Sequence, residues 1–244
     1  TESSHGTSCL SLMAGNIPDK YVGTAPLASY FLCRTEDVSS ENMIEEYNWV
    51  SAAEFLDSIG VDIISTSLGY VDFDLPQWDH VYSDLDGETS VITFGSEIAC
   101  SRGILCVTSA GNEGETSFPY ISVPADGENV LTVGAVDKYG DKASFSSIGP
   151  TYDNRIKPDV MAHGYNVTVA ATWGNGYADG SGTSFSCPVL AGMAACLWQA
   201  NKHLPASAIR DALRQNASET GNPNNNYGYG IPDFKAAFED LIIE

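Results

Sequence analysis

Short apolar strands alternate with amphipathic helices along most of this 244-residue chain, and this alternation restricts the fold more than any other feature. The runs typical of buried strands are residues 28–34, 62–67, 104–109, 129–136 and 167–172. Helical spacing of apolar residues covers 41–60, 90–103, 184–200, 206–216 and 234–242. Such alternation predicts a mostly parallel sheet with helices on both faces. We therefore expect the α/β class, a three-layer α/β/α architecture, and one domain over residues 1–244.

One of these helices opens with the run G-T-S-F-S-C-P at residues 182–188, which places Ser184 among small residues at the mouth of an apolar helix. Unpaired backbone N–H groups at a helix N-terminus favour developing negative charge, which suits a nucleophile that generates an oxyanion. We expect Pro188 in the first turn, where its missing N–H costs little. An isolated G-T-S would more often be an ordinary capped core helix, because Ser is a common N-cap.

Two distant segments carry complementary chemistry. His5 lies in H-G-T-S at the start of an apolar helix, and the buried run 104–109 leads into A-G-N-E-G at residues 110–114. An amide side chain such as that of Asn112, at the carboxyl end of a parallel strand, can point toward a site. Either residue alone would more often be structural. Together with Ser184, they supply the base, the oxyanion donor and the nucleophile that acyl transfer needs.

The chain resembles the catalytic domain of subtilisin-like serine proteases, the subtilases. Five blocks match in order: H-G-T at 5–7, S-L-G at 67–69, A-G-N-E-G at 110–114, K-P-D-V at 157–160 and G-T-S-x-S-x-P at 182–188. The resemblance implies a subtilisin-like fold and a serine endopeptidase acting on proteins or peptides. It places the catalytic serine at Ser184, the catalytic histidine at His5 and the oxyanion-hole asparagine at Asn112.

The same resemblance implies where substrate binds. Ser67, Leu68 and Gly69 match the edge on which a peptide adds as an extra strand. Ala110 and Gly111 would line a wall of the main specificity pocket, and we expect apolar or aromatic side chains before the scissile bond. The alternative interpretation of residues 67–69 is a simple strand end.

The main departure from the family is the catalytic aspartate, which should precede His5 because the family order is Asp, His, Ser. No D-x-G turn precedes His5, and Glu2 is too close in sequence to stand on a separate strand. We expect that the sequence is a fragment and that the aspartate lies upstream of it. The strand carrying the aspartate would lie inside the sheet, so we expect its gap to be filled by a cleaved upstream segment that stays bound or by another copy.

Alone, the chain would then have negligible activity. The alternative is a degenerate subtilase that acts as a non-catalytic peptide-binding or structural module.

Charge and composition exclude several classes of function. The net charge of −21, from 32 acidic and 11 basic residues, argues against nucleic acid as a partner. No apolar run is long enough to span a bilayer.

The segment 15–19 offers Asn16 and Asp19, too few ligands for calcium, so we assign no metal ligand and leave calcium open at other acidic loops. The resemblance implies a secreted or cell-envelope location.

The six cysteines form no C-x-x-C pair, which argues against a zinc or redox site. Most lie in apolar segments, so we expect buried free thiols. Cys187 follows Ser184 by three residues and is a candidate thiol nucleophile, although the family pattern favours Ser184. A disulfide between Cys9 and Cys187 stays open, because sequence alone does not settle such a pairing.

Overall fold

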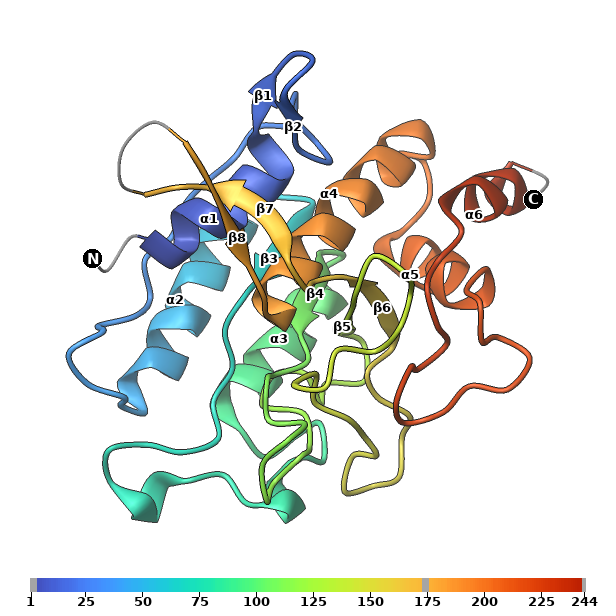
Figure 1. Cartoon of the computed structure of the whole chain (residues 1–244). Coiled ribbons are helices and arrows are strands. Elements are labelled where there is room, and N and C mark those ends of the chain that lie inside the picture. The colour runs from blue at the N-terminus through green and yellow to red at the C-terminus, as the bar shows by residue number, and fades with distance from the viewer. Residues whose placement is uncertain (1–3, 173–175, 243–244) are drawn as a thin grey trace.

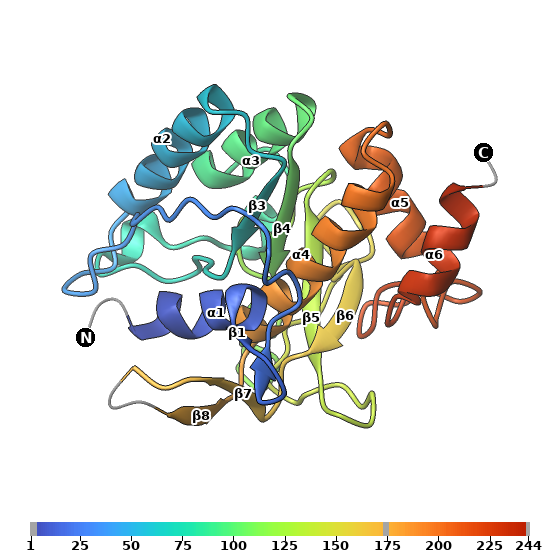
Figure 2. The ribbon, with the colours of Figure 1, turned by 90° about the horizontal axis from the view of Figure 1, so that it is seen from above.

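The computed structural model describes residues 4–172 and 176–242. Within them, a four-stranded sheet lies between two layers of helices (Figures 1 and 2). Its strands are β3 (Ile63–Thr66), β4 (Leu105–Ser109), β5 (Leu131–Val136) and β6 (Val160–His163), in the order β3-β4-β5-β6. Every neighbouring pair is parallel. The expected α/β class and three-layer α/β/α architecture are therefore confirmed.

Helices cover both faces of the sheet, as Figure 2 shows. On one face lie α2 (Ile44–Ser58) and α3 (Val91–Ser101), and on the other lie α4 (Thr183–Ala200), α5 (Ala206–Gln215) and α6 (Phe234–Leu241). Successive side chains of a strand point to opposite faces. Leu105 and Val107 of β4 therefore pack in the α4 layer, while Cys106 packs in the α2–α3 layer. Burial on both faces explains the unbroken apolar runs in the sequence.

The N-terminal helix α1 (Ser4–Ala14) packs against α4 and against β7 (Val167–Ala170), which pairs with β8 (Tyr177–Gly180). A small hairpin, β1 (Asn16–Ile17) with β2 (Tyr21–Val22), follows α1. Two short 3₁₀ helices, η1 (Pro76–Trp78) and η2 (Tyr82–Asp84), connect β3 to α3. None of the helices in the described ranges is long and apolar enough to cross a membrane.

The start of α3 is fixed by two side chains. Ser90 is the N-cap and accepts a hydrogen bond from the Thr93 N–H, as expected for a serine in this position. The carboxylate of Glu46, fully buried in α2, accepts from the Ile92 N–H at 3.0 Å and contacts His80 Nε2 at 2.7 Å. Glu46 therefore joins α2 to the N-terminus of α3, where a negative charge is favoured.

The expected strand at residues 28–34 is wrong. These residues form no strand, and Phe31 and Leu32 are 57% and 73% exposed. A strand needs a hydrogen-bonded neighbour. In the described part of the chain, β3 pairs only with β4, and residues 28–34 do not pair with its other edge or with any other strand. Sequence analysis also missed β6, β8 and the β1–β2 hairpin.

The K-P-D-V block has a structural role in this fold. Lys157 is 1% exposed, and its Nζ lies 2.8 Å from Asp159 Oδ2, 3.0 Å from the Val130 carbonyl and 3.1 Å from Thr132 Oγ1. Arg214 of α5 pairs with the other carboxylate oxygen of Asp159. These contacts tie β5 and β6 to the outer helix layer.

Candidate active site

Ser184 is the second residue of α4, which begins one residue earlier than the sequence indicates. Within the described residues, its hydroxyl makes no hydrogen bond. The expectation that Pro188 lies in the first turn is wrong, because counting from Thr183 places it in the second turn, inside the helix. Its missing N–H therefore affects the carbonyl four residues earlier, that of Ser184.

Asn112 lies beside the first residue of α4. Its Oδ1 accepts hydrogen bonds from the Thr183 N–H at 2.9 Å and from Thr183 Oγ1 at 3.1 Å. The Thr183 hydroxyl also contacts the main chain of Gly111, whose positive φ of 106° turns the chain after β4. Because the amide oxygen is held, the side-chain NH₂ group is left to donate elsewhere. The structure therefore brings Asn112 next to Ser184, through a residue that sequence analysis did not single out.

His5 lies in the first turn of α1 and faces the start of α4. Its ring centroid lies 6.0 Å from that of Phe185, and its Nε2 lies 3.7 Å from Cys9 Sγ. Burial lowers the pKa of its imidazole. No carboxylate of the described residues forms an ion pair with His5, and Glu2 lies outside those residues.

Three of the residues expected to bind substrate, Gly69, Ala110 and Gly111, lie around Ser122. A methyl group on Gly69 would lie 2.2 Å from the Ser122 hydroxyl oxygen, and one on Gly111 would lie 3.0 Å from it. The Ser122 N–H donates to the Ala110 carbonyl, and the flanking residues Tyr70 and Val123 form an antiparallel bridge. The S-L-G and A-G-N segments are therefore joined through Ser122. Only the family pattern assigned a substrate-binding role to either segment, and no local signal marked Ser122.

Ser67 and Leu68 are partly buried at the end of β3. The Ser67 hydroxyl donates to the Ser184 carbonyl at 2.8 Å. The Leu68 carbonyl accepts from Ser109 at 3.5 Å. The side chain of Ser67 therefore contacts Ser184, and the main chain of Ser67 is left for any pairing with a peptide.

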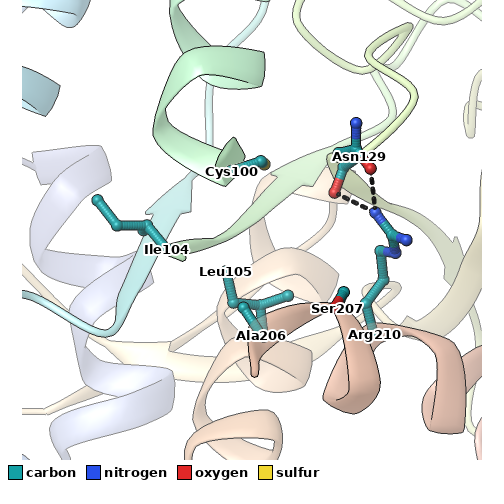
Figure 3. A pocket seen from close by; sticks show the side chains of 7 residues that line it. All are labelled: Cys100, Ile104, Leu105, Asn129, Ala206, Ser207 and Arg210. Carbon is teal, nitrogen blue, oxygen red and sulfur yellow. Dashed lines mark hydrogen bonds between the residues drawn. The ribbon is translucent and has the colours of Figure 1, made fainter. Parts of the chain in front are cut away.

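Two hollows of the described surface lie away from these residues. One, of about 50 Å³, is lined by Cys100, Ile104, Leu105, Asn129, Ala206, Ser207 and Arg210 (Figure 3). It lies where β4 begins, whereas Asn112 follows the end of that strand; ligands of α/β folds bind at the carboxyl ends of strands. Arg210 already donates to Asn129 within it. The other hollow, of about 280 Å³, lies between β2, β7 and the end of α1.

The cysteines are all unpaired, so the open question of a Cys9–Cys187 disulfide is answered in the negative. Burial raises the pKa of Cys187 to about 12 and that of Cys9 to about 11, and both stay as thiols at neutral pH. Cys187 is therefore a poor nucleophile. The expectation of buried thiols is wrong for Cys33 and Cys196, which are exposed.

In the described residues, one group of three carboxylates has oxygens within 4.8 Å of one another: Glu36, Glu41 and Glu45. Glu36 accepts from the Tyr70 hydroxyl at 2.8 Å, and Glu45 accepts from the Asp37 N–H at 2.8 Å. Neighbouring protein donors thus already satisfy part of this group, and none of its members belongs to the segment 15–19.

A comparison with known protein families identifies the family of this chain. The model of the subtilase family (Peptidase_S8) matches residues 1–230. The chain belongs to the subtilase family. It is 31% identical over 238 residues to subtilisin NAT of Bacillus subtilis subsp. natto and 30% identical over 258 residues to serine protease AprX of Bacillus subtilis (strain 168). The alignments cover 96% and 94% of this subtilase chain, but 56% of each relative.

Among solved structures, the self-cleaved protease domain of PatA is similar, with a TM-score of 0.79 and 26% identity. The match covers 98% of this chain and 83% of that domain. This subtilase chain therefore spans about half the length of the curated relatives it matches, and most of a solved protease domain.

Proposed function

We propose that this subtilase is a serine endopeptidase in which Ser184 is the nucleophile, His5 the general base and Asn112 an oxyanion donor. The observation that carries the proposal is the hydrogen bond from the Thr183 N–H to Asn112 Oδ1, at 2.9 Å. It fixes the amide beside the nucleophile and leaves the NH₂ group for a substrate oxygen. Donors that are already held in place stabilise developing charge without reorganisation during the reaction.

In this mechanism His5 takes the proton of the Ser184 hydroxyl as Oγ attacks the carbonyl carbon of the substrate. The negative charge moves to the carbonyl oxygen, where the Asn112 NH₂ and the Ser184 N–H donate to it. His5 then gives the proton to the leaving amine as the C–N bond breaks. Water, deprotonated by His5, then attacks the acyl carbon; the bond from that carbon to Ser184 Oγ breaks, and His5 returns the proton to Oγ.

The histidine needs an orienting carboxylate, and we propose that an aspartate upstream of residue 1 supplies it. Two observations support this. His5 has no carboxylate partner in the described ranges, and the outer edge of β3 is without a strand. A strand ending in an aspartate would pair with that edge and bring its carboxylate to the same end of the sheet as Ser67. That segment could stay bound after cleavage; the PatA domain, a relative, is described as self-cleaved.

Covalent labelling tests the proposal. A fluorophosphonate probe should label Ser184 in the full-length protein that contains this chain, and the Ser184→Ala variant should not be labelled. Residues 1–244 alone should label far more slowly, because His5 lacks its carboxylate. Absence of labelling in the full-length protein would favour a non-catalytic peptide-binding module, and equal labelling of both proteins would contradict the upstream aspartate.

We further propose protein or peptide substrates, a single domain over residues 1–244, and a secreted or cell-envelope location, as for a subtilisin-like protease. Cell fractionation of a tagged full-length protein tests the location.

A further inference from the structure

The carbonyl of Ser184 has lost its usual helical partner. In an α-helix each carbonyl accepts from the N–H four residues later. For Ser184 that residue is Pro188, which has no N–H and lies inside α4. The carbonyl oxygen of the proposed nucleophile therefore needs another donor, because a buried polar group without a partner is destabilising.

Two side chains from outside α4 supply that donor. The Ser67 hydroxyl, at the end of β3, donates at 2.8 Å, and the Cys9 thiol of α1 donates at 3.3 Å. Cys9 is 7% exposed, and burial raises its pKa to about 11, so the thiol keeps its proton at neutral pH. Both donors are available under the conditions in which a serine protease works.

The other side of the nucleophile is held as well. The Thr183 N–H, one residue earlier, donates to Asn112 Oδ1 at 2.9 Å. The Gly182–Thr183 peptide unit before Ser184 and the Ser184–Phe185 unit after it therefore both make contacts with segments outside α4. Between them stands the Cα atom that carries the reactive hydroxyl.

We propose that Ser67 and Cys9 are positioning residues that hold the Ser184 main chain in the geometry for attack, in place of the helical N–H that Pro188 lacks. This inference rests on the proposed function of Ser184. Cys9 also lies 3.7 Å from His5 Nε2, so one thiol contacts both the base and the main chain of the nucleophile. A misplacement of about 1 Å can lower the rate about 10²-fold, which gives such an anchor a kinetic effect.

The proposal is tested by a double-mutant cycle in the full-length protein, between Ser67→Ala and Pro188→Ala. Ser67→Ala should lower kcat roughly tenfold with KM nearly unchanged, because one hydrogen bond is removed from the nucleophile and none from the substrate. Ser67→Thr, which keeps the hydroxyl, should restore most of the rate. Cys9→Ala should act in the same direction. Ser101→Ala, which removes a hydroxyl bonded to the Ile98 carbonyl at an exposed position, is the matched control.

Pro188→Ala supplies the missing N–H, so in that background Ser67→Ala should lower kcat by less than about threefold. The cycle is measured twice, as the rate of fluorophosphonate labelling and as the free energy of unfolding. The proposal would be overturned if Ser67→Ala were labelled at the wild-type rate with no loss of kcat. It would also be overturned if Ser67→Ala lowered the rate equally with and without the Pro188→Ala change. If Pro188→Ala does not fold, the contrast between Ser67→Ala and Ser67→Thr decides.

If the wild-type protein is not labelled at all, the proposed function fails and the positioning role with it. The coupling in unfolding free energy would still show whether Ser67 and residue 188 compete for the Ser184 carbonyl. The two failures are therefore distinguishable.

Discussion

Replacement of Asn112 tests the proposed oxyanion donor most directly. In the structure its Oδ1 is occupied by Thr183, so the NH₂ group is the part that can reach a substrate. Asn112→Ala should lower kcat by about 10²–10³-fold, or about 2.7–4 kcal/mol, the loss known for such a donor in subtilisin, a relative of this chain. KM should change little, because the charge on the substrate oxygen develops only in the transition state.

Asn112→Asp separates the anchor from the donor. The carboxylate keeps an acceptor for Thr183 but has no N–H, and its negative charge opposes the oxyanion. We expect a kcat loss at least as large as for alanine. Because residue 112 is exposed, its hydrogen bond with Thr183 should contribute only about 0.5–1.5 kcal/mol to stability, and the aspartate variant should keep most of it.

The assay combines steady-state hydrolysis of a peptide substrate with thermal unfolding, both in the full-length protein. A drop in kcat without a comparable drop in Tm in Asn112→Asp supports a role in the transition state. A raised KM with unchanged kcat would instead assign Asn112 to ground-state binding, and the proposed oxyanion role would be wrong.

Three further outcomes follow from buried or crowded groups. Asp159→Asn should lower the free energy of unfolding by about 3–5 kcal/mol and Tm by about 10 °C, since Lys157 keeps a buried charge without its counter-ion. Asp211→Asn, at a half-exposed carboxylate, is the control, and equal losses of Tm in the two variants would contradict this reasoning. Burial, then neighbouring carboxylates, raise the pKa of Glu41 to about 7, so folding favours its protonated form and the contribution of Glu41 to stability is lost as pH rises from about 4.5 through 7. Glu41→Gln should therefore raise Tm relative to wild type at pH 8 but not at pH 4. A shift in Tm that is the same at both pH values would contradict the assignment. Cys187→Ala should keep kcat/KM within about threefold, because its thiol does not ionise at neutral pH, and a large loss would return Cys187 to the candidates for nucleophile.

The sheet and its helix layers were predictable because β4 and β5 are buried on both faces, so they read as unbroken apolar runs. Residues 28–34 show the limit of that signal. Their composition favours a strand, but strand formation depends on a hydrogen-bonded neighbour, which lies elsewhere in sequence. The run therefore predicts a strand, but in the described part of the chain it does not pair with the free edge of β3 or with any other strand.

At the site, the family pattern marked the residues that would do chemistry, and the structure brings Asn112 beside the first turn of α4. The side chains that hold these residues in place carried no comparable signal of that role in the sequence. Thr183, Ser122 and the hydroxyl of Ser67 are small polar residues of a kind common throughout the chain, and their roles depend on which carbonyl or N–H each one meets after folding. Local sequence does not encode that choice.

Pro188 is the case in which a sequence feature was noticed and its consequence was not. Pro188 is the sixth residue of α4 and lies past the first turn, so the N–H it lacks is the one that would bond to the Ser184 carbonyl. That carbonyl then accepts from β3 through Ser67 and from α1 through Cys9. Because α1 also carries His5, the N–H missing at Pro188 connects the base and the nucleophile through the Cys9 thiol, and the position of His5 and that of Ser184 should respond together to changes at Cys9.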